Sequence, residues 1–337
     1  MKRKDIVIVT PALAAANNGN WQTARRWARY LVDDYRVHVT DAWTPRSAGP
    51  DAALMIALHA RRSAASVAAW HATHPRRPLI LVLTGTDLYR DIDTDAAARH
   101  SLALAHRLVV LNDEGPRRLP AALRDRVTVC LQSAPARRAR PKTARHLRAL
   151  MVGHLREEKQ PRTYFEAARA LAQRKDILFD HIGDGLDPAL AAEARALASW
   201  QPRYRWLGGL PHAATRARIA AAHVLVHPSL LEGGANVVIE AVVSGTPVLA
   251  SRIDGNVGLL GPGYGGYFEP GDAAGLATLL QRVRDDPSML AALTRQCALR
   301  APLFDPARER QTLHALLADL LPQHPPEMPD ERPRKTR

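Results

Sequence analysis

The sequence predicts an α/β protein with two doubly wound parallel sheets. Short apolar runs alternate with longer amphipathic stretches rich in Ala and Arg, which is typical of βα units. Residues 134–142 interrupt this alternation with a polar, basic and proline-bounded stretch that is typical of a linker. A chain of 337 residues also exceeds the size of one small core. We therefore expect two similar domains that face each other across a cleft.

Each predicted strand is a short apolar run bounded by polar or turn-forming residues. In the first half we expect strands at residues 6–10, 37–41, 54–58, 79–84, 107–111 and 127–131, with helices at 23–31 and 63–71. In the second half the pattern predicts strands at residues 147–152, 177–182, 203–207, 224–226 and 247–250. Ligands of such sheets bind beyond the carboxyl ends of the strands, so the cleft is the expected site.

The domain boundaries follow from the linker and from the composition of the C-terminus. Residues 1–145 are predicted to form the first domain with the linker, and residues 146–302 the second domain. Residues 303–321 are predicted to form a terminal helix that packs back on the first domain. Residues 322–337 are rich in Pro and charged residues, and we expect them to be disordered.

The composition excludes several classes of protein. With 46% hydrophobic residues the chain is globular. It contains no uncharged apolar run of about 18 residues that would span a membrane. The N-terminus lacks the pattern of a signal peptide, so we expect a cytoplasmic protein. Two cysteines, Cys130 and Cys297, are too few for a disulfide framework or a four-cysteine zinc site.

The net charge is strongly positive, since 47 Lys and Arg residues against 33 Asp and Glu residues leave +14. Arg suits phosphate groups because its planar guanidinium donates two hydrogen bonds at once. The charge is compatible with nucleic acid, an anionic membrane surface, a phosphorylated small molecule or a merely Arg-rich composition. An aromatic content of 5% argues against nucleic acid. We expect small-molecule substrates, no nucleic acid and no integral membrane association.

Residues 227–241 carry the most specific chemical pattern in the chain. A strand is predicted to end near His227, a loop follows with Gly233 and Gly234, and a helix begins near Ala235. Glycines let a ligand approach the backbone closely, and the free N–H groups at a helix N-terminus favour a phosphate. The segment therefore predicts a phosphate-binding loop.

Two carboxylates flank this loop. Glu232 in the loop is suited to accept hydrogen bonds from sugar hydroxyls, and Glu240 on the helix is suited to grip a vicinal diol such as ribose. Taken singly, each glutamate would more simply be an ordinary helix carboxylate. Together with the glycine pair between them, they indicate a site for a sugar nucleotide.

The spacing of Glu232, seven residues and Glu240, followed by residues 244–248, resembles the E-x7-E region of family 4 glycosyltransferases. The resemblance implies the GT-B fold, in which two Rossmann-like domains face each other and a C-terminal helix crosses back. It also implies that the second domain binds a nucleotide-sugar donor, with Glu232 on the transferred sugar and Glu240 on the ribose. The backbone of residues 233–236 would hold the sugar and the diphosphate.

Residues 152–159 resemble a second motif of this family, G-R-L-x-x-x-K, whose Arg and Lys hold the donor diphosphate. Lys159 falls on the Lys position, whereas His154 stands where the family has Arg. A neutral His is a weaker partner for a diphosphate, and Arg156 is a candidate to compensate. With weaker turn patterns included, the expected donor-binding residues are Gly19, His154, Arg156, Lys159, Gly183, Glu232, Gly233, Gly234, Ala235, Asn236 and Glu240.

The resemblance also implies that the first domain supplies the acceptor site. Four polar segments of this domain follow predicted strands: residues 17–20, 59–63, 84–90 and 112–114. They offer neutral hydrogen-bond donors and positive charge, and the expected acceptor-binding residues are Asn18, Asn20, Arg61, Arg62, Thr84, Gly85, Thr86 and Arg90. The candidate catalytic residues are Glu232, Lys159, His59 and Asp87. His59 is either a proton-transfer group or a hydrogen-bonded structural residue, and Asp87 either orients an Arg or acts as a base.

A narrower resemblance involves residues 19–20, 58–63, 83–91 and 152–156, which are similar to the selenosugar synthases of bacterial selenoneine biosynthesis. This resemblance implies a C–Se bond formed from UDP-N-acetylglucosamine, or a related UDP-sugar, and selenophosphate. UDP and phosphate would leave, and partner enzymes would supply selenophosphate. The alternative is a retaining family 4 transferase with a hydroxyl acceptor. No metal-binding pattern is evident, so we expect no metal and no other cofactor.

Overall fold

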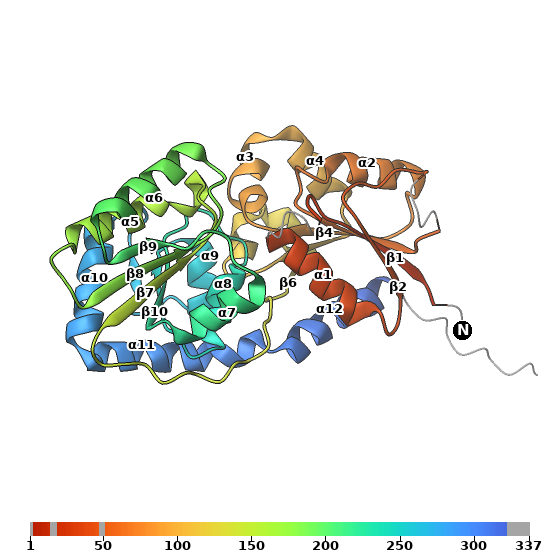
Figure 1. Cartoon of the computed structure of the whole chain (residues 1–337). Helices are drawn as coiled ribbons and strands as arrows, with labels where there is room; N and C mark the ends of the chain where they lie inside the picture. The colour runs from red at the N-terminus through yellow and green to blue at the C-terminus, as the bar shows by residue number, and fades with distance from the viewer. Residues whose placement is uncertain (1–2, 14–18, 47–50, 322–337) are drawn as a thin grey trace, which may run out of the picture.

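The computed structural model describes residues 3–13, 19–46 and 51–321 (Figure 1). The predicted acceptor residue Asn18 and the predicted C-terminal tail, residues 322–337, lie outside these ranges. The chain contains two six-stranded sheets in which all strand pairs are parallel. The predicted fold class is therefore confirmed.

The first sheet has the strand order β2-β1-β3-β4-β5-β6. Its strands are β1 (Asp5–Val9), β2 (Arg36–Thr40), β3 (Leu54–Leu58), β4 (Leu79–Leu83), β5 (Arg107–Val110) and β6 (Val127–Val129). The connecting helices and turns are α1 (Gly19–Leu31), α2 (Ala64–Thr73), η2 (Asp87–Asp91), α3 (Ile92–Thr94), α4 (Ala96–Leu104), η3 (Gly115–Arg118) and η4 (Ala121–Arg126). All five residues of β3 and of β4 are buried, as expected for central strands with helices on both faces.

The second sheet has the order β12-β11-β10-β7-β8-β9, which is the Rossmann arrangement with its reversal between β7 and β10. Its strands are β7 (Leu147–Val152), β8 (Ile177–Ile182), β9 (Tyr204–Trp206), β10 (Val224–His227), β11 (Val248–Ser251) and β12 (Tyr267–Phe268). The helices and turns are η5 (Glu157–Lys159), α5 (Pro161–Ala170), α6 (Pro188–Trp200), α7 (His212–Ala221), α8 (Asn236–Val242), α9 (Asp254–Leu260), α10 (Ala273–Asp285), α11 (Pro287–Arg300) and η6 (Ala301–Phe304).

Local sequence explains where several helices of the second half begin. Asp187, Asp272 and Asp286 each cap a helix by accepting a hydrogen bond from a backbone N–H in its first turn. In α6 and α11 a proline follows the cap directly, where its missing N–H costs nothing.

The structure corrects three local expectations. α1 begins at Gly19 rather than at residue 23, so its first turn lies at the cleft. Residues 87–91, expected as part of a loop, form the helical turn η2. β12 was not predicted, because a strand of two residues is too short to show a hydrophobic period.

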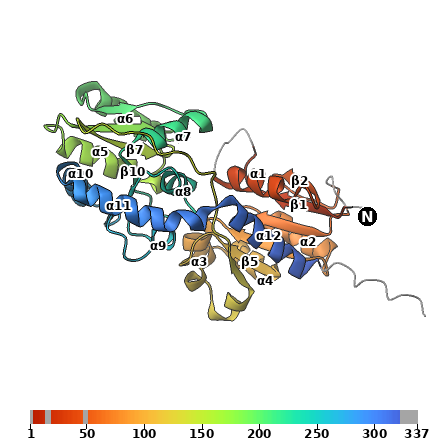
Figure 2. The ribbon, with the colours of Figure 1, turned by 90° about the horizontal axis from the view of Figure 1, so that it is seen from below.

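The C-terminal helix α12 (Pro306–Leu320) lies across the first domain beyond the end of α11 (Figure 2). Leu313 and Leu317 join a core cluster that includes residues of α1 and the first sheet. The buried Glu309 carboxylate accepts hydrogen bonds from Arg26 Nε at 2.8 Å and from Trp27 Nε1 at 2.7 Å, both on α1. This helix therefore ties the end of the second half of the chain to the first domain.

Candidate active site

A cavity of about 380 Å³ lies between the two domains, beyond the carboxyl ends of β7, β8 and β10. We call it the donor pocket. It lies at the point where the strand order of the second sheet reverses, which is where ligands of such sheets bind. From the first domain, Gly19 and Gln22 on α1 line it, and a Cβ atom at Gly19 would lie 3.8 Å from Asn236 Nδ2 of α8.

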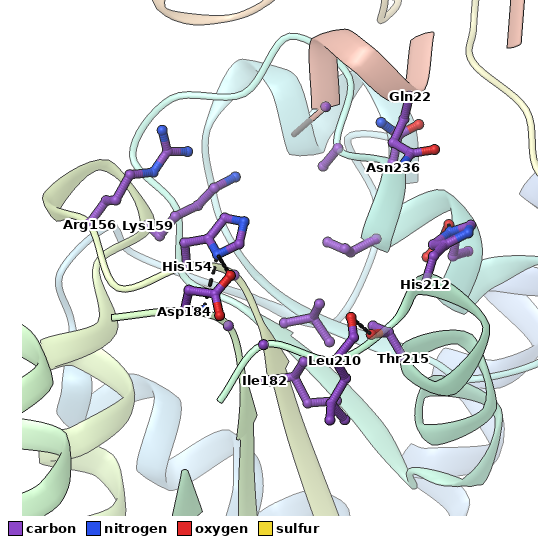
Figure 3. Close-up of a pocket in the computed structure, with 18 of the residues that line it drawn as sticks. Gln22, His154, Arg156, Lys159, Ile182, Asp184, Leu210, His212, Thr215 and Asn236 are labelled. Carbon is purple, nitrogen blue, oxygen red and sulfur yellow. Dashed lines mark hydrogen bonds and ion pairs between the residues drawn. The ribbon is translucent and has the colours of Figure 1, made fainter. Parts of the chain in front are cut away.

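One wall of the donor pocket carries His154, Arg156 and Lys159 (Figure 3). His154 Nδ1 accepts a hydrogen bond from the backbone N–H of Asp184 at 3.0 Å. Burial lowers the pKa of His154, so the ring is neutral and carries its proton on Nε2. The ring thus offers a neutral N–H donor where the family motif has an Arg.

Arg156 supplies positive charge on the same wall. Its Nε is buried and has no hydrogen-bond partner among the residues that the structure describes. A buried polar group without a partner is costly, and an anionic ligand would satisfy it. Arg156 is therefore well placed to hold a diphosphate.

Lys159 and Glu232 form the central ion pair of the site, with Lys159 Nζ 2.5 Å from Glu232 Oε1. His227 Nε2 lies 3.2 Å from the same carboxylate oxygen. Burial alone would raise the pKa of Glu232, but the Lys159 ammonium and His227 outweigh burial and hold this pKa below its usual range. Glu232 is therefore an anion at the bottom of the cleft.

The opposite wall of the donor pocket contains Glu240 on α8 and His212 at the start of α7. Glu240 Oε1 lies 2.6 Å from His212 Nε2, and Glu240 is buried whereas His212 is exposed. The second carboxylate oxygen of Glu240 takes part in no hydrogen bond within the described residues. A carboxylate in this setting has room to accept a hydrogen bond from a diol.

A second, smaller cavity of about 140 Å³ adjoins the first domain. We call it the acceptor cavity. Its lining includes several of the predicted acceptor residues, namely Asn20, Arg62, Thr84, Gly85 and Thr86. Arg156, Lys159 and Glu232 line both cavities, so the ion pair lies at their junction. A reaction between ligands of the two cavities would take place there.

Two predicted acceptor residues, Arg61 and Arg90, do not line this cavity. Arg61 Nε lies 2.8 Å from Asp91 Oδ2, and Arg90 Nε lies 3.1 Å from Asp91 Oδ1. Both arginines thus pair with Asp91 of η2, since a nearby carboxylate is a strong partner for a guanidinium group.

Asp87 pairs with no arginine side chain among the described residues. Its fully buried carboxylate accepts hydrogen bonds from the backbone N–H groups of Ala60, Thr84 and Gly85, at 2.9, 2.8 and 2.9 Å. Asp87 therefore holds together the two loops that follow β3 and β4.

Gly233, predicted to face the donor, instead packs against the first domain. A Cβ atom at this position would lie 2.5 Å from the carbonyl carbon of Thr84, and Asn112 Nδ2 donates to the Gly233 carbonyl at 2.6 Å. Gly233 does not line the donor pocket, whereas Gly234 lines both cavities. The glycine pair thus allows the two domains to approach each other at the cleft.

The remaining predicted donor residues, Gly19, Gly183, Ala235 and Asn236, line the donor pocket. At Gly183 the backbone φ is 153°, and a Cβ would lie 1.9 Å from the carbonyl oxygen of Gly153. Only glycine allows the loops after β7 and β8 to meet so closely.

Sequence reasoning missed several lining residues, namely Gln22, Thr23, Gln132, Asp184, His212 and Thr215. Gln132 directly follows a predicted strand, and Asp184 lies between two glycines after another, so strand-end position would have found both. Gln22, Thr23, His212 and Thr215 lie on helices, and no local pattern in the sequence marks the faces that reach the cleft.

None of the helices in the described part of the chain has the length and hydrophobicity needed to cross a bilayer. Within the same residues, no three His, Cys, Asp or Glu side chains are grouped as a metal site would require.

The family model for group 1 glycosyl transferases matches residues 134–299, about half of the chain. The chain is similar to the 2-deoxystreptamine glucosyltransferase of Streptomyces kanamyceticus, with 34% identity over 148 residues. That alignment covers 43% of this chain and 38% of the relative. A 2-deoxystreptamine N-acetyl-D-glucosaminyltransferase of Streptomyces fradiae is 30% identical over 200 residues, which are 54% of this chain and 42% of the relative. The chain thus matches less than half the length of either relative.

Solved structures resemble almost the whole chain. The structure of HepE from Anabaena in complex with UDP and glucose has a TM-score of 0.75 at 17% identity and covers 94% of this chain and 100% of that one. Sucrose-phosphate synthase from Thermosynechococcus elongatus has a TM-score of 0.73 at 18% identity, over 94% of this chain and 99% of that one. These likenesses and the two facing sheets establish the GT-B fold. With the match over residues 134–299, they support a group 1 glycosyl transferase.

Proposed function

We propose that the protein is a glycosyltransferase that binds a UDP-sugar in the donor pocket and transfers the sugar to a hydroxyl group held in the acceptor cavity. The observation that carries this proposal is the Lys159–Glu232 ion pair, which lies at the junction of the two cavities. The curated relatives named above are a glucosyltransferase and an N-acetyl-D-glucosaminyltransferase, and the group 1 model matches residues 134–299 of this chain.

In the proposed reaction, the bond between the anomeric carbon and the diphosphate oxygen breaks, and its electron pair leaves with UDP. Lys159 and Arg156 would stabilise the charge that develops on the diphosphate, and His154 Nε2–H would add a neutral hydrogen bond. A new bond forms between the anomeric carbon and the acceptor oxygen, whose proton is released to solvent. Because these side chains supply the positive charge, the proposal includes no metal and no other cofactor.

The other residues that line the donor pocket are assigned to the ribose, the base and the transferred sugar of the donor. Glu240, beside His212, would accept hydrogen bonds from the ribose hydroxyls. Val152, Ile182 and Leu210 line the same pocket and would pack against the base. Glu232 would accept a hydrogen bond from a hydroxyl of the transferred sugar. An anionic Glu232 suits this role, since a protonated carboxyl would lose acceptor capacity.

The test is UDP release from UDP-N-acetylglucosamine or UDP-glucose in the presence of candidate hydroxyl acceptors, with the product identified by mass spectrometry. We expect acceptor-dependent release, with strong loss in the Glu232→Gln variant. Arg169→Ala is the matched control, because Arg169 lies on α5 and pairs with Glu166. Absence of UDP release with every donor and acceptor would refute the proposal.

Selenophosphate is a second candidate for the acceptor, and the size and charge of the acceptor cavity favour it. The cavity measures only about 140 Å³, and its lining contains three cationic residues, Arg62, Arg156 and Lys159, and two carboxylates, Glu158 and Glu232. Such a site suits a small anionic nucleophile, which needs cations to approach an anionic donor and little activation by a base. The anomeric carbon would form a C–Se bond as UDP leaves, and water would then cleave the Se–P bond and release phosphate.

A direct comparison of acceptors separates the two candidates. If selenophosphate is the acceptor, UDP release from UDP-N-acetylglucosamine depends on it, and a selenium-bearing sugar and phosphate appear together. Under this proposal, the chain acts after an enzyme that makes selenophosphate. UDP release without selenium in any product would leave the hydroxyl acceptor as the proposal.

A further inference from the structure

His59 occupies an unusual position at the edge of the acceptor cavity. It directly follows β3, it is 2% exposed, and its backbone φ is 73°. A positive φ is uncommon for residues other than glycine, and such strained positions persist only where the surrounding structure fixes them. The side chain of His59 is therefore held in one orientation. The hydrogen-bond partners of its two ring nitrogens show the role of this orientation.

The partners of the ring fix its tautomer. His59 Nδ1 lies 3.3 Å from the backbone nitrogen of Arg62, which can only donate, so Nδ1 accepts. The ring proton is then on Nε2, and Nε2 lies 3.0 Å from Thr86 Oγ1. His59 thus donates to Thr86, and the Thr86 oxygen accepts.

This direction leaves the hydroxyl proton of Thr86 available. The hydroxyl group has one proton, and no hydrogen bond between described residues uses it. Thr86 lines the acceptor cavity. The hydroxyl is therefore free to donate to an atom of a ligand in that cavity, and the ligand must offer a lone pair there.

We propose that Thr86 donates a hydrogen bond to the acceptor substrate and that His59 is a positioning residue that fixes the direction of this bond. This inference rests on the proposed function, because it assumes that the acceptor binds in this cavity. It adds one detail to that function. The acceptor presents to Thr86 an oxygen with a free lone pair, such as that of a hydroxyl or phosphate-type group.

The surroundings of His59 argue against proton transfer by its ring. The charged groups that face it are Asp87 and Asp91, each with an oxygen 4.0 Å from a ring nitrogen, and the guanidinium groups of Arg61 and Arg62. Both carboxylates already accept from closer donors. Burial lowers the pKa of His59, and both ring nitrogens have internal partners.

The geometry offers variants that isolate each bond. His59→Asn keeps a side chain that tolerates a positive φ and an oxygen able to accept from the Arg62 N–H, but it is too short to reach Thr86. Thr86→Val removes the hydroxyl with little change in volume, and Thr86→Ser retains it. The double variant, His59→Asn with Thr86→Val, completes a double-mutant cycle.

We expect Thr86→Val to raise the KM for the acceptor about 3- to 10-fold, as for loss of one hydrogen bond, with the KM for the UDP-sugar unchanged. His59→Asn should have a similar effect, Thr86→Ser a smaller one, and the double variant no more than either single variant. Urea unfolding of each variant shows whether the fold is retained. In His59→Asn, the pH profile of kcat/KM should keep the shape that it has in the wild type.

Two results would overturn the inference while leaving the proposed function intact. One is a loss of about 10²-fold or more in kcat for His59→Asn together with loss of one limb of the pH profile, which would make His59 the proton carrier. The other is additive effects in the double variant, which would show that the two residues act independently. If the wild type released no UDP at all, the proposed function itself would fail, so the two failures are distinguishable.

Discussion

The two walls of the cleft use their charged side chains in different ways. On the wall from the second domain, Lys159 and Arg156 face both cavities, and Arg156 Nε has no partner within the described chain. On the wall from the first domain, Arg61 and Arg90 both pair with Asp91. Of these three neighbouring arginines, Arg62 lines the acceptor cavity.

The difference teaches that an arginine in a site loop is available to a ligand where no nearby carboxylate takes its hydrogen bonds, as for Arg156 but not for Arg61 and Arg90. In the second domain, Lys159 after β7 pairs with Glu232 after β10, at the junction of the two cavities. The loops after β3 and β4 bring their own carboxylates, Asp87 and Asp91, and use them to hold the loops together.

The strongest test of this comparison is the removal of the central cation. Lys159→Ala should lower the rate of UDP release about 10²- to 10³-fold, because the leaving diphosphate loses a stabilising charge in a water-poor site. Glu232 would also lose its partner, and its pKa should rise toward the usual range. Steady-state kinetics with Arg169→Ala as control measure the effect. Activity of Lys159→Ala close to that of the wild type would place the reaction centre elsewhere.

The contact between the walls can be tested at Gly233. Gly233→Ala would place a Cβ 2.5 Å from the Thr84 carbonyl carbon, and we expect it to destabilise the protein by about 1–3 kcal/mol through overpacking. Gly263→Ala is the control, because a Cβ there meets no described atom within 4 Å and its φ is not positive. Urea unfolding measures both, and equal midpoints for the two variants would contradict the close packing at Gly233.

Acid should weaken the second domain through His181, at the end of β8. His181 Nε2 donates to the Gly153 carbonyl at 3.0 Å, and burial lowers the pKa of His181 to about 4. As the pH falls below about 6.5, His181 takes up a proton in the unfolded chain but stays neutral in the folded chain. The free energy of unfolding therefore decreases until the pH reaches about 4.

Between pH 6.5 and pH 5 this difference amounts to about 2 kcal/mol. His181→Gln retains a donor for Gly153 but has no titrating group, so its unfolding free energy should fall less over the same interval. Urea titrations of wild type and variant at the two pH values provide the measurement. Parallel losses in the two proteins would mean that other groups cause the acid sensitivity.

The finest test compares two adjacent arginines of the first domain. Arg62→Ala should raise the KM for an anionic acceptor about 10-fold, as for loss of one charged hydrogen bond. Arg61→Ala should change it by less than about 2-fold, because Arg61 bonds to Asp91, which keeps Arg90 as a partner. Acceptor saturation curves distinguish the two, and an equal effect of both substitutions would contradict the different roles of the two side chains.

Position after a strand let the sequence predict several of the residues that line the donor pocket. Val152 and Ile182 end two predicted strands, and the loops that follow carry His154, Lys159 and Gly183 into the donor pocket. The structure shows contacts of Arg61, Arg90, Asp87 and Gly233 that the sequence did not indicate. Arg61 pairs with a carboxylate from another loop, and Gly233 packs against a loop of the other domain. Arg90 pairs with its chain neighbour Asp91, and sequence spacing alone does not show that the two side chains meet.

The sequence by itself determined the two parallel sheets, the linker and the pair of glutamates at the second-domain cleft, because hydrophobic period, proline and glycine act over a few residues. Only the tertiary structure decided which arginines face the cavities, that Gly233 supports the contact between domains, and that His59 donates to Thr86. The physical reason is that hydrogen bonds and ion pairs form between whichever groups the fold brings within about 3 Å, and the chain order does not record these distances.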